Sequence, residues 1–169
     1  MNSKSKRVAL FGLMVALAFM LSYLESLLPF NFGVPGVKLG LANLVVVVAL
    51  YTMKKSEAFA IAIIRILLAS VTFGNPLSLL YSLAGGLLSF CIMALTKDKK
   101  LSVVGVSMLG GISHNIAQIT VAAIVTGTSR IAYYLPVLLV AGTVTGFLLG
   151  YLSKIIIDRV KKVNEKTGS

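Results

Sequence analysis

Residues 54–100 read KKSEAFAIAIIRILLASVTFGNPLSLLYSLAGGLLSFCIMALTKDKK, and this stretch decides the fold class. Between the lysines at its two ends, residues 58–96 contain a single charged side chain, that of Arg65. As one helix these residues would measure about 58 Å, nearly twice the thickness of the hydrocarbon core of a bilayer. The Gly74-Asn75-Pro76 sequence near their centre is a strong turn signal. The stretch therefore predicts two helices that cross a membrane and return to the starting side.

Lys and Arg residues gather in four groups at the ends of apolar runs, as expected of the cytoplasmic loops of membrane proteins. We therefore predict an all-α integral membrane protein of the cell membrane. It would be a single transmembrane domain, a bundle of six helices with both termini in the cytoplasm. The expected spans are about 8–28, 37–53, 58–73, 77–96, 101–125 and 131–157. The basic groups are Lys4, Lys6 and Arg7; Lys54 and Lys55; Lys97, Lys99 and Lys100; and Lys154, Arg159, Lys161, Lys162 and Lys166.

The composition argues against other classes of protein. The chain is 57% hydrophobic and 12% charged, which leaves too little polar surface for a soluble domain. Its net charge of +11 would suit nucleic acid, but the charges flank apolar runs, so we expect membrane lipid as a partner and no nucleic acid. Cys91 is the single cysteine and His114 the single histidine, which is poor support for a metal site.

Polar side chains inside the spans are costly and therefore mark candidate functional positions. A guanidinium as deep as that of Arg65 requires a carboxylate, carbonyls, water or an anionic ligand. Glu25 is the acidic residue that could pair with it; otherwise Arg65 points into a wet cavity. His114 and Gln118 are four residues apart on one helix face. They could join an interhelical network with Asn43 or contact a ligand.

Counting from the basic groups at 1.5 Å per residue places these polar residues mainly in the outer half of the membrane. We therefore expect a site for a small polar or negatively charged molecule near the outer face. Two outer segments, residues 30–37 and 73–76, could cover it. The candidate ligand-binding residues are Asn31, Phe32, Lys38, Asn43, Arg65, Asn75, Tyr81, His114, Asn115, Gln118 and Arg130.

Small residues recur at spacings that let helices approach closely in lipid. Those of the later spans suit packing within the bundle. Gly12 and Ala16, on the first span, are the best candidates for docking a partner membrane protein. The later small residues are Gly85, Gly86, Gly110, Gly111, Gly142, Gly146 and Gly150.

The sequence contains no recognisable catalytic constellation. It has no Asp-rich Mg²⁺ motif, no nucleophile beside a base and no phosphate-binding loop followed by Lys-Ser or Lys-Thr. We therefore expect a binding protein rather than an enzyme.

Three segments of the chain resemble the Gx transporter family, which is often labelled heptaprenyl diphosphate synthase component I. Members of this family resemble the substrate-binding S components of energy-coupling factor transporters. The segments are residues 35–43 (PGVKLGLAN), residues 73–78 (FGNPLS) with Tyr81-Ser82 and Gly85-Gly86, and Ser113-His114-Asn115 with Gln118.

The resemblance implies an S-component-like bundle whose ligand site near the outer face is covered by loops. It also implies docking of a transmembrane coupling protein on the first helix, with ATPases supplying the energy. The familiar docking pattern has two alanines, whereas this chain has Gly12 and Ala16.

Two alternative functions follow from the same family. One is a non-catalytic membrane accessory of heptaprenyl diphosphate synthesis, since the chain has only two Asp and no Asp-rich motif for Mg²⁺-diphosphate. The other is a quinone- or flavin-binding component of a membrane electron-transfer system. No cofactor is firmly implied; a quinone, prenyl or flavin ligand belongs to these alternatives.

Overall fold

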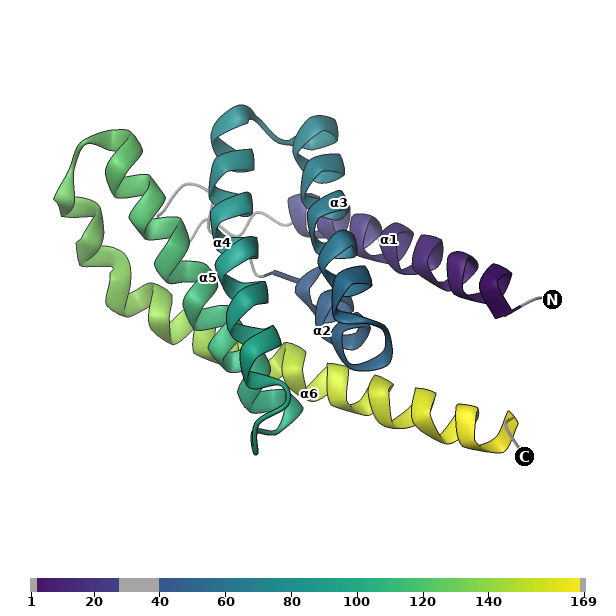
Figure 1. Ribbon diagram of the computed structural model, residues 1–169. Coiled ribbons are helices and arrows are strands. Elements are labelled where there is room, and N and C mark those ends of the chain that lie inside the picture. Colours follow the sequence, from purple (N-terminus) through teal and green to yellow (C-terminus); the bar gives the residue numbers. More distant parts are fainter. Residues whose placement is uncertain (1–2, 28–39, 168–169) are drawn as a thin grey trace.

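A computed structural model describes residues 3–27 and 40–167 (Figure 1), and this part of the chain is helical with connecting turns. Five of its helices are long and apolar enough to cross a membrane, so the chain is a multi-pass membrane protein. Of the predicted ligand residues, Asn31, Phe32 and Lys38 lie outside the described residues. The helices are α1 (Ser3–Leu27), α2 (Asn43–Thr52), α3 (Lys55–Phe73), α4 (Pro76–Thr96), α5 (Val103–Thr126), the 3₁₀ helix η1 (Ser129–Tyr134) and α6 (Leu135–Thr167).

The turn predicted within residues 58–96 separates α3 from α4. Asn75 Oδ1 accepts a hydrogen bond from the Ser78 backbone N–H at 2.8 Å, and the Asn75 N–H donates to Ser78 Oγ at 3.0 Å. Pro76 occupies the first turn of α4, where its missing N–H costs nothing. Asn75 is thus the N-cap of α4.

The second span differs most from its expected form. Helix was expected over residues 37–53, but α2 has ten residues and a length of about 15 Å, shorter than a crossing. Gly40 adopts a left-handed φ of 75°, and the Asn43 N–H bonds to the Gly40 carbonyl, so the helix begins only at Asn43. Residues 45–50 of α2 are buried, enclosed by α1, α3 and α6.

The last helix begins differently from the predicted span as well. The span was expected to begin at about residue 131; instead η1 covers residues 129–134, and α6 begins at Leu135 with Pro136 in its first turn. The helix continues to Thr167, ten residues beyond the expected end of the span. Both chain ends lie on one side of the bundle (Figure 1).

Glycines bring α5 and α6 into backbone contact. A Cβ added at Gly142 would lie 2.7 Å from the Gly111 carbonyl oxygen. One at Gly146 would lie 2.8 Å from the Ser107 carbonyl oxygen, and one at Gly150 the same distance from Val104 Cα. These glycines serve packing within the bundle, as the sequence predicted.

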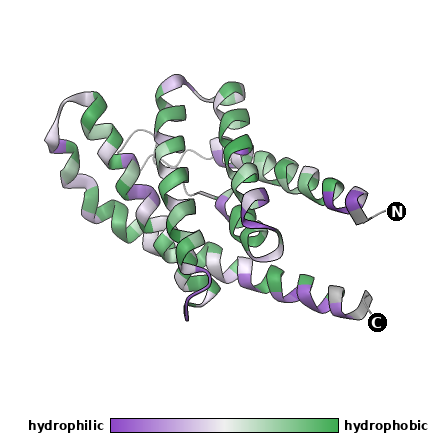
Figure 2. Ribbon diagram, viewed as in Figure 1, coloured by the Kyte–Doolittle hydropathy of each residue, from purple (hydrophilic) through white to green (hydrophobic). Residues whose placement is uncertain are grey.

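The first three basic groups lie close together in space. Arg7 Nε bonds to Glu57 Oε1 at 2.5 Å, which joins the start of α1 to the start of α3. Lys55 Nζ lies 2.6 Å from Asp98 Oδ2, which joins the start of α3 to the α4–α5 turn. Figure 2 shows hydrophilic residues at these turns and at the chain ends, and largely apolar helices between them.

Candidate ligand-binding site

Two small cavities meet inside the bundle, and Gly40 and His114 line both of them. The first, which we call the Arg65 cavity, has a volume of about 30 Å³; the second, the Asn43 cavity, about 20 Å³. Each has room for about one or two water molecules. The Arg65 cavity is lined by Ser22, Glu25, Gly40, Arg65, Ile66, Ala69, Ser70, Ser82, His114 and Gln118. The Asn43 cavity is lined by Gly40, Asn43, Val47, Met93, Ser107, Gly111, His114, Asn115, Thr145, Gly146 and Leu149.

Arg65, on α3, is 9% exposed and is held by a neutral partner. One of its terminal nitrogens donates to Asn43 Oδ1 at 3.0 Å, which ties α3 to the first residue of α2. Its Nε is buried and has no hydrogen-bond partner among the residues that the structure describes. A buried N–H that stays unpaired costs about 1–3 kcal/mol. The guanidinium therefore retains an unused donor beside the cavity.

Glu25, on α1, lines the same cavity and interacts electrostatically with Arg65. Its Oε1 accepts a hydrogen bond from the Gly40 backbone N–H at 2.5 Å. The carboxylate thus holds the left-handed residue that precedes α2, while the hydrogen bond of Arg65 goes to Asn43. Glu25 therefore lies near Arg65 at the cavity, and no direct hydrogen bond between these two side chains is present in the described part of the chain.

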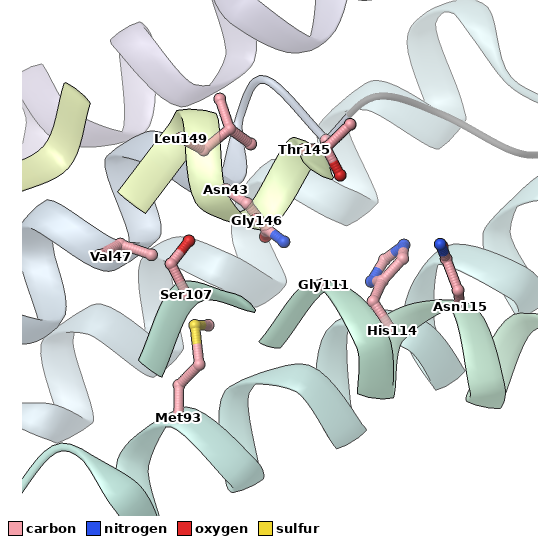
Figure 3. Close-up of a pocket in the computed structure, with 11 residues that line it drawn as sticks. Asn43, Val47, Met93, Ser107, Gly111, His114, Asn115, Thr145, Gly146 and Leu149 are labelled. Atoms are coloured by element: carbon pink, nitrogen blue, oxygen red, sulfur yellow. The ribbon is translucent and has the colours of Figure 1, made fainter. Parts of the chain in front are cut away.

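Asn115 and His114, both on α5, contact two different helices. Asn115 Nδ2 donates to the Leu138 carbonyl at 2.6 Å and so holds α6. His114 packs on α4 at Gly85, where an added Cβ would lie 2.7 Å from the imidazole Cε1. Figure 3 shows Asn43 from α2 and His114 and Asn115 from α5 around the Asn43 cavity. The absence of a side chain at Gly85 makes room for the ring between the two cavities.

The structure brings five predicted ligand residues together and leaves three elsewhere. Asn75 is exposed and caps α4, and Arg130 is exposed in η1. Tyr81 is half-buried on α4 and lines neither cavity. The five residues at the cavities are Asn43, Arg65, His114, Asn115 and Gln118.

Several cavity residues were absent from the sequence prediction. Ser22 and Glu25 are three residues apart on one face of α1, a spacing that could have paired them. Ser70 and Ser82 come from α3 and α4, and isolated serines in apolar helices give no distinguishing signal. Glu25 was considered as a partner of Arg65 but not as a wall of the site.

One of three comparisons with known proteins gave a match. A family model described as heptaprenyl diphosphate synthase component I matches residues 14–156, which is most of the chain. Neither a search of curated proteins nor a search of solved structures gave a significant match. The match over residues 14–156 shows that this chain belongs to the heptaprenyl diphosphate synthase component I family.

Proposed function

We propose that the chain is the membrane-embedded substrate-binding subunit, S-component-like, of an energy-coupling factor-type transporter. The observation that carries this proposal is the buried Arg65, whose Nε is an unused donor beside a polar cavity. A cation kept in the interior at a cost in free energy is expected to have a functional reason. The ligand would present an anionic or strongly polar group to Arg65.

The proposed orientation places both termini in the cytoplasm and the ligand site toward the outer face. It is supported by the contacts of the basic turns, since Arg7 with Glu57 and Lys55 with Asp98 gather the first three basic groups. Positively charged residues mark the cytoplasmic side. The ligand would then enter from the opposite side, between the outer ends of the helices.

The small size of the cavities bears on how a ligand would bind. Sites for small molecules usually enclose about 300–1,000 Å³, whereas the two cavities measure about 30 and 20 Å³. Binding would therefore require the walls around Arg65 and His114 to move apart. A closed form that opens toward its ligand is compatible with a subunit that must also release it.

The proposed partner is an energy-coupling module, a transmembrane coupling protein with its ATPases. Gly12 and Ala16 are exposed on α1, and a Cβ added at Gly12 would meet nothing within 4 Å. This pair therefore forms no close helix contact within the described residues, in contrast to the glycines between α5 and α6. A partner helix could approach α1 closely there.

Ligand binding can be tested on the full chain purified in detergent. Any small molecule that co-purifies is identified by native mass spectrometry, and its affinity is compared for wild type, Arg65→Ala, Asn43→Ala and His114→Ala. Loss of one charge-assisted contact should weaken binding by about 1.5–3 kcal/mol. Arg159→Ala, on the exposed part of α6, is the matched control. Unchanged affinity in all three cavity variants would eliminate the proposed site.

The family description favours a second candidate, a non-catalytic membrane accessory of heptaprenyl diphosphate synthesis. A component of a synthase implies a partner subunit that carries the catalytic residues. The test is reconstitution of the chain with a prenyl diphosphate synthase in lipid, with the rate of chain elongation as the readout. An increase in that rate would support the accessory role, and no increase in any lipid would remove it.

A further inference from the structure

A further recess lies away from both the Arg65 cavity and the Asn43 cavity, where the start of α1 meets the α2–α3 turn. It has a volume of about 500 Å³, and we call it the basic groove. The residues that concern its chemistry are Lys6, Arg7, Leu10, Met53, Lys54 and Glu57. The groove is thus charged at one end and apolar along one wall.

The charges of the groove are unbalanced. Glu57 uses both carboxylate oxygens within the protein, since Oε1 accepts from Arg7 Nε at 2.5 Å and Oε2 accepts from the Lys54 backbone N–H at 3.0 Å. The ammonium groups of Lys6 and Lys54 are exposed and make no hydrogen bond or ion pair with the described residues. Three cations against one carboxylate leave a formal charge of +2.

The apolar wall continues away from the charges along α1. Leu10 is 39% exposed, and it is followed on the same helix face by Leu13 and Leu17, which are 55% and 41% exposed. A hydrocarbon chain lying on this stripe would run from the groove toward the apolar middle of the helix. A soluble anion would occupy the charged end and leave the stripe unused.

We propose that the basic groove binds the phosphate headgroup of a membrane amphiphile, with its hydrocarbon tail along α1. Lys6 and Lys54 contact the phosphate oxygens, and the Arg7–Glu57 pair fixes the distance between the starts of α1 and α3, where these two lysines lie. The shared chemistry is a phosphate or diphosphate ester on a long apolar chain. Both an anionic phospholipid and a polyprenyl diphosphate have it. This site does not depend on the ligand at Arg65.

The test uses the full chain in nanodiscs of neutral phosphatidylcholine. Three probes are added in separate arms: phosphatidylglycerol, heptaprenyl diphosphate and inorganic diphosphate. Retention of each probe is measured by native mass spectrometry for wild type and for the Lys6→Gln/Lys54→Gln variant. Each charge-assisted contact between a lysine and a phosphate oxygen contributes a roughly ten-fold effect or more, so we expect about 100-fold weaker retention of the amphiphile that binds.

Two further variants distinguish binding in the basic groove from attraction to general surface charge and from binding of the phosphate alone. Lys161→Gln/Lys162→Gln removes the same charge from the exposed end of α6 and should change retention less than about two-fold. Leu10→Ser should weaken retention of the amphiphile and leave that of inorganic diphosphate unchanged. Equal losses in the two lysine variants would reduce the groove to general surface charge and overturn the proposal. Inorganic diphosphate retained as tightly as the better-retained amphiphile would overturn it as well.

Discussion

Arg65 and Arg7 place the same side chain in two very different surroundings. Arg7 is exposed at the start of α1 and bonds directly to the carboxylate of Glu57 at 2.5 Å. Arg65 is buried, donates to the neutral amide of Asn43, and keeps an unpartnered Nε. Among the described residues, the direct arginine–carboxylate ion pair thus lies where water already screens charge, although pairing matters more in the interior. This difference indicates that Arg65 is not retained for stability.

The largest effect on this comparison is expected from Arg65→Met. This substitution keeps much of the side-chain volume and removes the positive charge. We expect ligand affinity to fall about 10- to 150-fold, because a charge-assisted contact is lost. We expect the free energy of unfolding in detergent to change little, because the cost of burying the cation is removed together with its attraction to Glu25, and Glu25 keeps its bond to Gly40. Chemical unfolding and ligand binding are measured on the same preparation. A strongly destabilised variant with normal affinity would make Arg65 structural.

Asn43→Leu removes the hydrogen-bond partner and leaves the guanidinium buried. We expect a loss of about 1–3 kcal/mol in the free energy of unfolding, since a buried donor then lacks its acceptor. Adding Arg65→Met should recover most of that loss, which a double-mutant cycle measures. If the effects of the two substitutions simply added, the two side chains would not be coupled.

Gly85→Ala tests whether the position of the His114 ring matters for ligand binding, and it changes no charge. The added methyl would lie 2.7 Å from the imidazole ring, so the ring has to shift within the space between the cavities. We expect a loss of stability of about 1 kcal/mol and a several-fold loss of ligand affinity. Gly12→Ala, where nothing lies within 4 Å, is the control and should change neither quantity. Unchanged ligand affinity in Gly85→Ala would exclude His114 from the ligand site.

Asp98 carries the smallest expected effect. The Lys55 ammonium donates a hydrogen bond to Asp98 and lowers its pKa below the ordinary value of 3.8. The stabilisation is therefore present above pH 4 and is lost as the pH falls through the lowered pKa. Because the pair is exposed, Asp98→Asn should lower the unfolding temperature slightly at pH 7 and not at pH 2. An equal effect at both pH values would contradict this assignment.

The order of the helices could be predicted because lipid imposes simple rules on a sequence. Residues 58–96 are too long for one crossing, and Asn75-Pro76 supplies a helix start, so the α3–α4 hairpin followed. The start of α2 could not be placed, because residues 37–53 are mostly apolar and the break depends on the left-handed backbone at Gly40. Hydropathy also cannot distinguish a helix enclosed by other helices from one that faces lipid.

The residues of the candidate site could be predicted only in part, because a sequence pattern does not show how helices pack together. Arg65, His114 and Gln118 were identified because their polarity is conspicuous in an apolar helix. Glu25 and the serines of the Arg65 cavity come from three helices, and their convergence depends on packing. Asn75 was assigned to the ligand although Asn followed by Pro at a helix start also signals a cap. Local rules thus found the deep polar residues but not the side chains that surround them.

A structure of the chain with its co-purified ligand would test the central claim most directly. The measured quantity is the distance from Arg65 Nε to the nearest polar atom of the ligand. We predict an anionic or strongly polar group at about 2.7–3.2 Å from Nε, with His114 and Glu25 also lining an enlarged cavity. A ligand bound elsewhere, with Arg65 still bonded only to Asn43 inside an unchanged cavity, would contradict it.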